Sequence, residues 1–240
     1  MRFATPLIAA TLIRRYKRFL ADVRLDDGTV AVAHCPNPGA MTGLADPGMR
    51  VWLEPNDDPR KKLRFGWRLT ELPDGRLAGV DTGVPNRVVG EALRAGAVPG
   101  LPSYDIVRAE VPYGARSRVD FVLSGPGGDL FLEVKNVHFR RDGDWAAFPD
   151  SVTKRGATHL DEMAAVVRDG GRAVTLYLVQ RPDCARLTLA GDLDPGYAAA
   201  FARARDAGVG ALAFGTRITT AGVWLGDPMP VSVPAGATGG

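Results

Sequence analysis

The spacing of apolar and polar residues predicts short strands in the first third of the chain. Alternating runs at 19–25 and 29–34 flank an Asp-Asp-Gly turn, and similar runs follow at 50–53, 63–72 and 76–80. An Asp-Gly pair between two alternating runs favours a hairpin. Five or so strands in about 80 residues predict a small closed barrel, for which the five-stranded OB fold is the leading candidate. We assign residues 1–82 to this domain.

After the boundary at residues 82–86, apolar residues recur at the three- to four-residue spacing of helices. They predict helices from Asn86, as the capping residue, to Gly96, from Thr153 to about residue 169, and over 195–207. Continuous apolar runs at 173–180 and 209–214 are typical of strands buried on both faces, and 217–225 fits an edge strand. These elements predict an α/β domain with a mixed sheet over residues 83–234. Residues 235–240 are expected to be a disordered tail.

A predicted hairpin at the centre of this domain carries the candidate chemistry. Runs of strand-forming residues at 117–123 and 130–137 flank a Gly-Pro-rich loop. If Leu123 pairs with Leu130, the residues on one face of both strands are all apolar, whereas a slip of one residue would scatter them. In this register Asp120 lies opposite Glu133, and Lys135 is one pleat further along.

Opposed carboxylates on a sheet are destabilising unless a positive charge neutralises them. A hard divalent cation held by Asp120 and Glu133 would do so, leaving Lys135 to meet developing negative charge. Only 5 of the 30 basic residues are lysines, so an amine here is not the default cation of this chain. Glu91, on the preceding helix, is a candidate additional acid. The alternative is a solvated strand face with an incidental acid–base pattern, and a solvated Glu91.

Two basic–aromatic segments in the first domain suit phosphate contacts and base stacking. The nucleic-acid-binding candidates are Arg14, Arg15, Tyr16, Lys17 and Arg18 in the first segment and Lys61 and Lys62 in the second. His34 and Asn37, in a loop rich in Pro and Gly, could also contact a ligand. For each segment the alternative is an ordinary solvated strand face. For His34 the alternative is a structural hydrogen bond, which is the commoner role of a lone histidine after a strand.

Composition bounds the class of protein. The 240 residues are 45% hydrophobic and 24% charged, as in a soluble globular protein, and the net charge of +3 arises entirely within the first 85 residues. That charge permits a polyanionic partner. Two cysteines fit neither a disulfide framework nor a metal-ligand spacing. With no signal peptide evident and no apolar run near 18 residues, we expect a cytoplasmic protein without a membrane segment.

The paired acids, one followed two residues later by lysine, resemble the PD-(D/E)xK nuclease core, although Val119 replaces its proline. In that family the acids hold Mg²⁺ and the lysine orients the nucleophile or stabilises charge. A closer resemblance covers nearly the whole chain. The strings TLIRRYKRFL (11–20), HCPN (34–37), SRVDF (117–121), EVKNV (133–137) and FPD (148–150) are similar to the sugar fermentation stimulation protein family, SfsA. Ala40 departs from the serine of many relatives.

This resemblance implies an OB-like barrel joined to a PD-(D/E)xK nuclease-like α/β domain, and DNA binding linked to sugar (maltose) utilisation genes. The leading hypothesis is a DNA-binding protein with a Mg²⁺- or Mn²⁺-dependent phosphodiesterase site at Asp120, Glu133 and Lys135. The second is a non-catalytic DNA-binding regulator on the same fold. The third, a small-molecule enzyme using general acid–base chemistry, fits the basic–aromatic segments poorly. The choice between DNA and RNA, strandedness and oligomeric state, including a homodimer, stay open.

Overall fold

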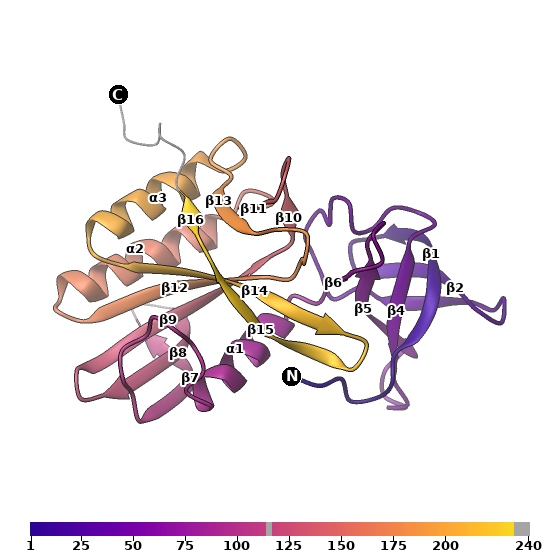
Figure 1. The fold of residues 1–240 in the computed structure, drawn as a ribbon, viewed down its shortest axis with the longest axis horizontal. Helices are drawn as coiled ribbons and strands as arrows, with labels where there is room; N and C mark the ends of the chain where they lie inside the picture. Colours follow the sequence, from indigo (N-terminus) through magenta and orange to yellow (C-terminus); the bar gives the residue numbers. More distant parts are fainter. Residues whose placement is uncertain (114–116, 233–240) are drawn as a thin grey trace.

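The first six strands form a small barrel, on the right in Figure 1. The computed structural model describes residues 1–113 and 117–232. The strand order is β3-β2-β1-β4-β5-β6, and a parallel pairing of β3 with β5 closes the barrel. The predicted OB-like fold is confirmed. The strands are β1 (Ile8–Tyr16), β2 (Leu20–Leu25), β3 (Val30–His34), β4 (Arg50–Pro55), β5 (Phe65–Glu71) and β6 (Leu77–Gly79).

The strand β1 was not predicted from the sequence. Its inward residues Ala10 and Leu12 are fully buried in the barrel core, but the register with β2 shifts between Leu12 and Arg14. Such a bulge interrupts the two-residue alternation by which strands are recognised.

The second domain is built on a six-stranded mixed sheet of order β15-β14-β12-β9-β8-β7. The central strand β12 is parallel to both neighbours, β9 and β14, and the outer pairs are antiparallel. This mixed α/β architecture is the predicted one. The strands are β7 (Ile106–Tyr113), β8 (Ser117–Gly125), β9 (Gly128–Val137), β12 (Arg172–Val179), β14 (Gly210–Thr219) and β15 (Gly222–Met229).

Helices cover both faces of this sheet (Figure 1). Helix α1 (Val84–Arg94) packs its apolar side against one face, and α2 (Lys154–Arg168) and α3 (Pro195–Asp206) cover the other. Thr153 caps α2 as predicted, since its side chain accepts a hydrogen bond from Gly156 N–H. The predicted cap at Asn86 is wrong: α1 begins two residues earlier, after Gly83. Asn86 therefore lies within the helix, and its amide is available for a contact elsewhere.

Beside α2 lies a second, four-stranded sheet that the sequence did not predict. Its order is β10-β11-β13-β16. Each strand has two to four residues, too short for a recognisable alternation. The strands are β10 (Phe139–Arg140), β11 (Trp145–Phe148), β13 (Arg186–Leu189) and β16 (Val231–Ser232).

The predicted register of the central hairpin is confirmed, because Leu123 pairs with Leu130 and Phe121 with Leu132. One detail is wrong. Val119 packs in the core beneath α2 and α3, whereas Phe121 and Leu123 pack in the core beneath α1. The alternation changes at Asp120, opposite which Glu110 of β7 has a positive φ of 53° and is skipped in the β7–β8 ladder.

A network of buried side chains joins the two domains. Asn37 of the barrel donates to Nδ1 of His138 at 3.2 Å and to the Val80 carbonyl at 2.9 Å. The Gln180 side-chain amide donates to the Asp81 carbonyl at 3.0 Å, and the Gln180 main-chain carbonyl accepts a hydrogen bond from Gly79 N–H at 2.9 Å. The domains are thus held together by hydrogen bonds between buried polar groups, although Gln180 Oε1 has no partner among the described residues.

The N-terminal residues attach to the second domain. Met1 is buried in the core beneath α1, and Arg2 bridges to Gly222. The first domain was expected to begin at residue 1, but its first strand starts at Ile8. Among the helices described, none is long and apolar enough to cross a membrane. The tail expected at residues 235–240 lies outside the described residues.

Candidate active site

Asp120 lies where the central hairpin opens. The β8–β9 ladder ends at the Phe121–Leu132 pair, one step before Asp120 and Glu133. Val134 N–H donates to Oδ2 of Asp120 at 2.7 Å, and Asn86 Nδ2 donates to Oδ1 at 2.6 Å. Both carboxylate oxygens are therefore oriented, one by the neighbouring strand and one by α1. The sequence did not predict this role for Asn86.

Glu133 is almost fully buried, with 4% of its surface exposed. Its Oε1 accepts hydrogen bonds from Lys135 Nζ at 2.8 Å and from His159 Nδ1 at 2.6 Å. Arg155 donates to the other ring nitrogen of His159 at 3.2 Å, which leaves the Nδ1 proton for Glu133. The second oxygen, Oε2, is buried without a hydrogen-bond partner among the described residues. A buried carboxylate oxygen left in this state is costly unless a ligand uses it.

The two carboxyl groups have pKa values shifted in opposite directions. Burial and then the negative charge of Glu133 raise the pKa of Asp120 to about 6. Burial alone would also raise the pKa of Glu133, but hydrogen bonds from His159 and Lys135 outweigh it and lower that pKa. At neutral pH both groups are ionised. A nearby positive charge would stabilise the ionised form of Asp120.

Two further polar groups, Tyr113 and Glu162, belong to this neighbourhood and were missed from the sequence. The Tyr113 hydroxyl and Glu162 Oε2 are both buried without a partner in the described part of the chain. Burial, followed by the charges of Glu133, Glu162 and Asp120, raises the pKa of Tyr113 above its ordinary value. Glu162 follows His159 by three residues on α2, so the helical period places both on one face. This three-residue spacing is the sequence feature that could have placed Glu162 beside His159.

The donor set fits a hard cation and not zinc. Within residues 1–113 and 117–232 no three His, Cys, Asp or Glu side chains are grouped as a complete metal site. Mg²⁺ does not need such a cage, because it keeps several waters and takes one or two carboxylates plus substrate phosphate oxygens. Asp120 and the unpartnered Oε2 of Glu133 provide that kind of ligand.

The expected role of Glu91 is wrong. Its carboxylate pairs with the N-terminal ammonium of Met1 at 2.6 Å, and its side chain is 58% exposed. Glu91 follows Asn86 by five residues, which turns it about 140° around the helix axis from the residue that contacts Asp120. The residue of α1 at the site is therefore Asn86.

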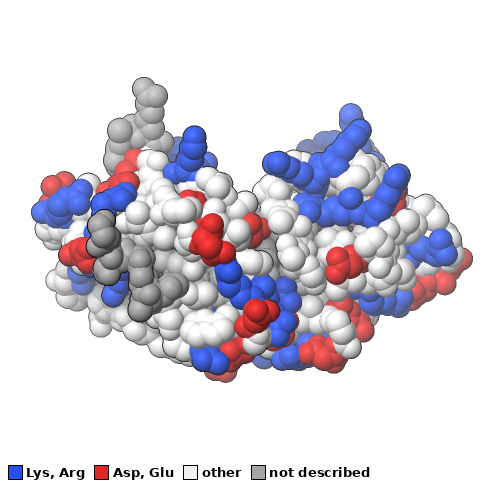
Figure 2. Space-filling model, turned by 90° about the horizontal axis from the view of Figure 1, so that it is seen from above, with Lys and Arg blue, Asp and Glu red and all other residues white. Residues whose placement is uncertain are grey.

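The basic residues of the barrel have different surroundings. Figure 2 shows Lys and Arg gathered on the barrel lobe beside the hollow between the domains. Arg14 pairs with Asp22 at 2.7 Å and lies over the ring of Tyr16. Arg15 donates to four main-chain carbonyls, of Arg18, Asn37, Gly39 and Ala40. Arg15 thus supports the loop at 37–40.

The second basic segment borders a groove on the barrel. This groove has a volume of about 750 Å³, and its walls include His34, Lys61, Lys62 and Phe65. His34 and both lysines are exposed, as a nucleic-acid contact requires. Asn37 is not, since 2% of its surface is exposed and its amide joins the domains. The structure therefore gives Asn37 an interdomain structural role.

The chain matches two family models in tandem, described as the SfsA N-terminal OB domain over residues 13–80 and the sugar fermentation stimulation protein RE domain over residues 83–222. The sugar fermentation stimulation protein homolog of Dinoroseobacter shibae is 62% identical, with 99% of this chain and 98% of the relative covered. The homolog of Jannaschia sp. is 61% identical over 96% of this chain and 97% of the relative. The structure of Pyrococcus furiosus SfsA in complex with Ca²⁺ has a TM-score of 0.85 and 26% identity, covering 97% of this chain and 98% of the other. The chain therefore belongs to the sugar fermentation stimulation protein family.

Proposed function

We propose that this protein is a Mg²⁺- or Mn²⁺-dependent phosphodiesterase acting on nucleic acid, with its site at Asp120, Glu133 and Lys135. The observation that carries the proposal is the state of Glu133. One oxygen is held by Lys135 and His159, while the other is buried without a partner among the described residues, and the negative charge of Glu133 helps to raise the pKa of Asp120. The related P. furiosus protein is described in complex with Ca²⁺, which, like Mg²⁺, prefers oxygen ligands.

Each residue of the site has a distinct task in this proposal. A bound Mg²⁺ would polarise the scissile phosphate and lower the pKa of a coordinated water. Asp120 and Glu133 would hold it, and Asn86 and Val134 N–H fix the orientation of the Asp120 carboxylate. Lys135, held 2.8 Å from Glu133, would offer its ammonium to the charge developing on the phosphate oxygens. His159 donates to the same Oε1 and helps to hold Glu133 in place.

The barrel supplies the second half of the proposal, which is binding of the nucleic-acid backbone. Lys61 and Lys62 are exposed at the groove, together with His34. Such cations attract phosphates without reading sequence.

A non-catalytic DNA-binding regulator of sugar (maltose) metabolism genes is the second candidate. One observation favours it: Lys135 already neutralises Glu133, so the site is not left with two uncompensated acids.

Calorimetric titration with Mn²⁺ tests the cation site directly. We expect one site in the wild type, its loss in Asp120→Asn and Glu133→Gln, and its retention in Lys135→Ala. Asp129→Asn is the matched control, because Asp129 is on the same hairpin but pairs with Arg108 on the surface. Equal Mn²⁺ binding by the wild type and both acid variants would contradict the proposed site.

A further inference from the structure

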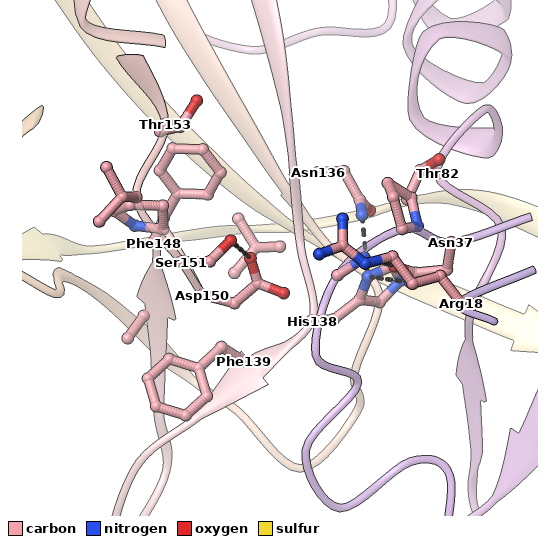
Figure 3. Close-up of a pocket in the computed structure, with 16 residues that line it drawn as sticks. Arg18, Asn37, Thr82, Asn136, His138, Phe139, Phe148, Asp150, Ser151 and Thr153 are labelled. Carbon is pink, nitrogen blue, oxygen red and sulfur yellow. Dashed lines mark hydrogen bonds between the residues drawn. The ribbon is translucent and has the colours of Figure 1, made fainter. Parts of the chain in front are cut away.

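A cavity of about 360 Å³ lies between the two domains, within the range of small-ligand pockets, about 300–1,000 Å³. Figure 3 shows Arg18 reaching into it from the barrel side, with Asp150 and Ser151 opposite. Phe139 and Val137 add apolar wall. The hydrogen-bond network that joins the domains does not use the Arg18 side chain.

Asp150 is held in place by the opposite domain. Its Oδ2 accepts from Ala40 N–H at 3.3 Å, and Ser151 Oγ donates to Oδ1 at 3.2 Å. A Cβ at Gly39 would lie 2.4 Å from the same Oδ2, so only glycine allows the loop this close to Asp150. Each carboxylate oxygen has two lone pairs, so Asp150 keeps acceptor capacity that faces the cavity.

Arg18 occupies a strained turn. Lys17, Arg18 and Phe19 connect β1 to β2, and Lys17 and Arg18 have positive φ of 48° and 63°, a backbone region that residues other than Gly, Asn and Asp seldom adopt. Arg15 Nε donates to the Arg18 carbonyl at 3.0 Å and holds the turn. Among the described residues, the Arg18 guanidinium forms neither a salt bridge nor a hydrogen bond. The Arg18 side chain is exposed at the cavity, and a positive φ at such a position makes Arg18 a candidate ligand contact.

The cavity adjoins the candidate active site through two elements. Asn136 lines it and directly follows Lys135, and Thr82 lines it four residues before Asn86, which contacts Asp120. The cavity and the candidate active site therefore share strand β9 and the segment that leads into α1.

We propose that this cavity takes one unpaired guanine nucleotide of a single-stranded nucleic acid, an inference that rests on the proposed function. The two oxygens of the Asp150 carboxylate are hydrogen-bond acceptors and match the adjacent N1–H and N2–H donors of the guanine Watson–Crick edge. Arg18 provides the charge for the phosphate of the same nucleotide. Because a base enters the cavity only when it is unstacked and unpaired, a continuous duplex is excluded.

Nucleotide titrations in EDTA test the cavity without involving the cation site. GMP should bind roughly ten-fold more tightly than IMP, which lacks the N2 donor, because one charge-assisted hydrogen bond is lost. Asp150→Asn keeps the acceptor for Ala40 N–H, so the fold should persist while the preference for GMP over IMP disappears. Equal binding of GMP and IMP by the wild type would overturn the assignment.

Two substitutions of equal charge isolate the role of Arg18. In Arg18→Asn, which tolerates the positive φ, the advantage of GMP over guanosine should vanish while guanosine binding is unchanged. Arg24→Gln, an exposed arginine of the same barrel outside the cavity, should keep that advantage. If Arg18→Asn weakens guanosine as much as GMP, Arg18 does not contact the phosphate.

Oligonucleotides decide whether the guanine belongs to a strand. A thymidine nonamer with one central guanine should bind more tightly than GMP, than the same nonamer with hypoxanthine, and than the same sequence within a duplex. A nonamer that binds no more tightly than GMP would overturn the strand assignment. Failure of these preferences with cleavage intact would reject the cavity alone, whereas loss of cleavage with the preferences intact would reject the phosphodiesterase alone.

Discussion

Asn86 of α1 donates a hydrogen bond to Oδ1 of Asp120 at 2.6 Å, and so ties the helix to the strand that carries the first acid of the site. Groups that orient a metal ligand in this way typically contribute ten-fold or more to affinity. We expect Asn86→Ala to lower Mn²⁺ affinity roughly ten-fold in calorimetry. Glu91→Gln is the control on the same helix, because Glu91 contacts Met1 instead. If the two variants lose affinity equally, Asn86 does not orient Asp120.

Backbone phosphate contacts should be revealed by the salt dependence of nucleic-acid binding. Each lost phosphate contact lowers the slope of log affinity against log salt by about 0.7–0.9. Lys61→Ala with Lys62→Ala should therefore lower the slope by roughly 1.4–1.8, for all sequences alike. Arg14→Ala should lower it less than one of these lysines does, because Asp22 already neutralises that charge. An unchanged slope in the double-lysine variant would show that the groove edge does not meet phosphates.

The interdomain histidine makes stability depend on pH. Burial and then the positive charge of Arg181 lower the pKa of His138 from 6.5 to about 3. Below pH 6.5 the unfolded chain therefore binds a proton that the folded chain excludes, so stability falls as pH falls from 6.5 towards 3. Relative to pH 7, the wild type should lose about 2 kcal/mol at pH 5 from this group.

Urea unfolding of the wild type and His138→Gln at pH 7 and pH 5 measures this contribution. Because both proteins share every other titrating group, the difference between their pH dependences belongs to His138. His34→Gln, at an exposed histidine, should keep the wild-type dependence. Parallel pH profiles for the wild type and His138→Gln would contradict the assigned burial of a neutral imidazole.

The central hairpin shows how far sequence reasoning reaches. The alternation of apolar residues was sufficient to assign the Leu123–Leu130 pair, because a shifted register would expose half of the apolar set. The OB-like barrel and the mixed sheet were also predictable, since each follows from local periods and turn residues. The opening of the ladder at Asp120 was not, because it depends on Val134 N–H, Asn86 and a skipped residue on β7.

Contacts between distant segments account for most of the differences. Asn is a residue type that commonly caps helices, so the sequence favours that role for Asn86. Only the packing of α1 on β8 shows that its amide faces Asp120. Glu91 was the plausible helix acid by sequence, but the N-terminus folds back on α1 and pairs with it. Asn37 and His138 are 101 residues apart, and their buried contact depends on how two domains meet. Local sequence patterns carry no information about contacts between segments that are far apart in the chain.

Cleavage by the wild type and Lys135→Ala, measured side by side, tests the central claim most directly. Single-stranded DNA and RNA with one guanine should be cut slowly in Mg²⁺ or Mn²⁺, and EDTA should stop the reaction. Lys135→Ala should bind Mn²⁺ and nucleic acid as the wild type does, yet cut neither substrate, which also excludes a contaminating nuclease. If the wild type binds single-stranded, double-stranded and structured substrates but leaves all of them intact, or if Lys135→Ala cuts as fast as the wild type, the phosphodiesterase assignment is contradicted.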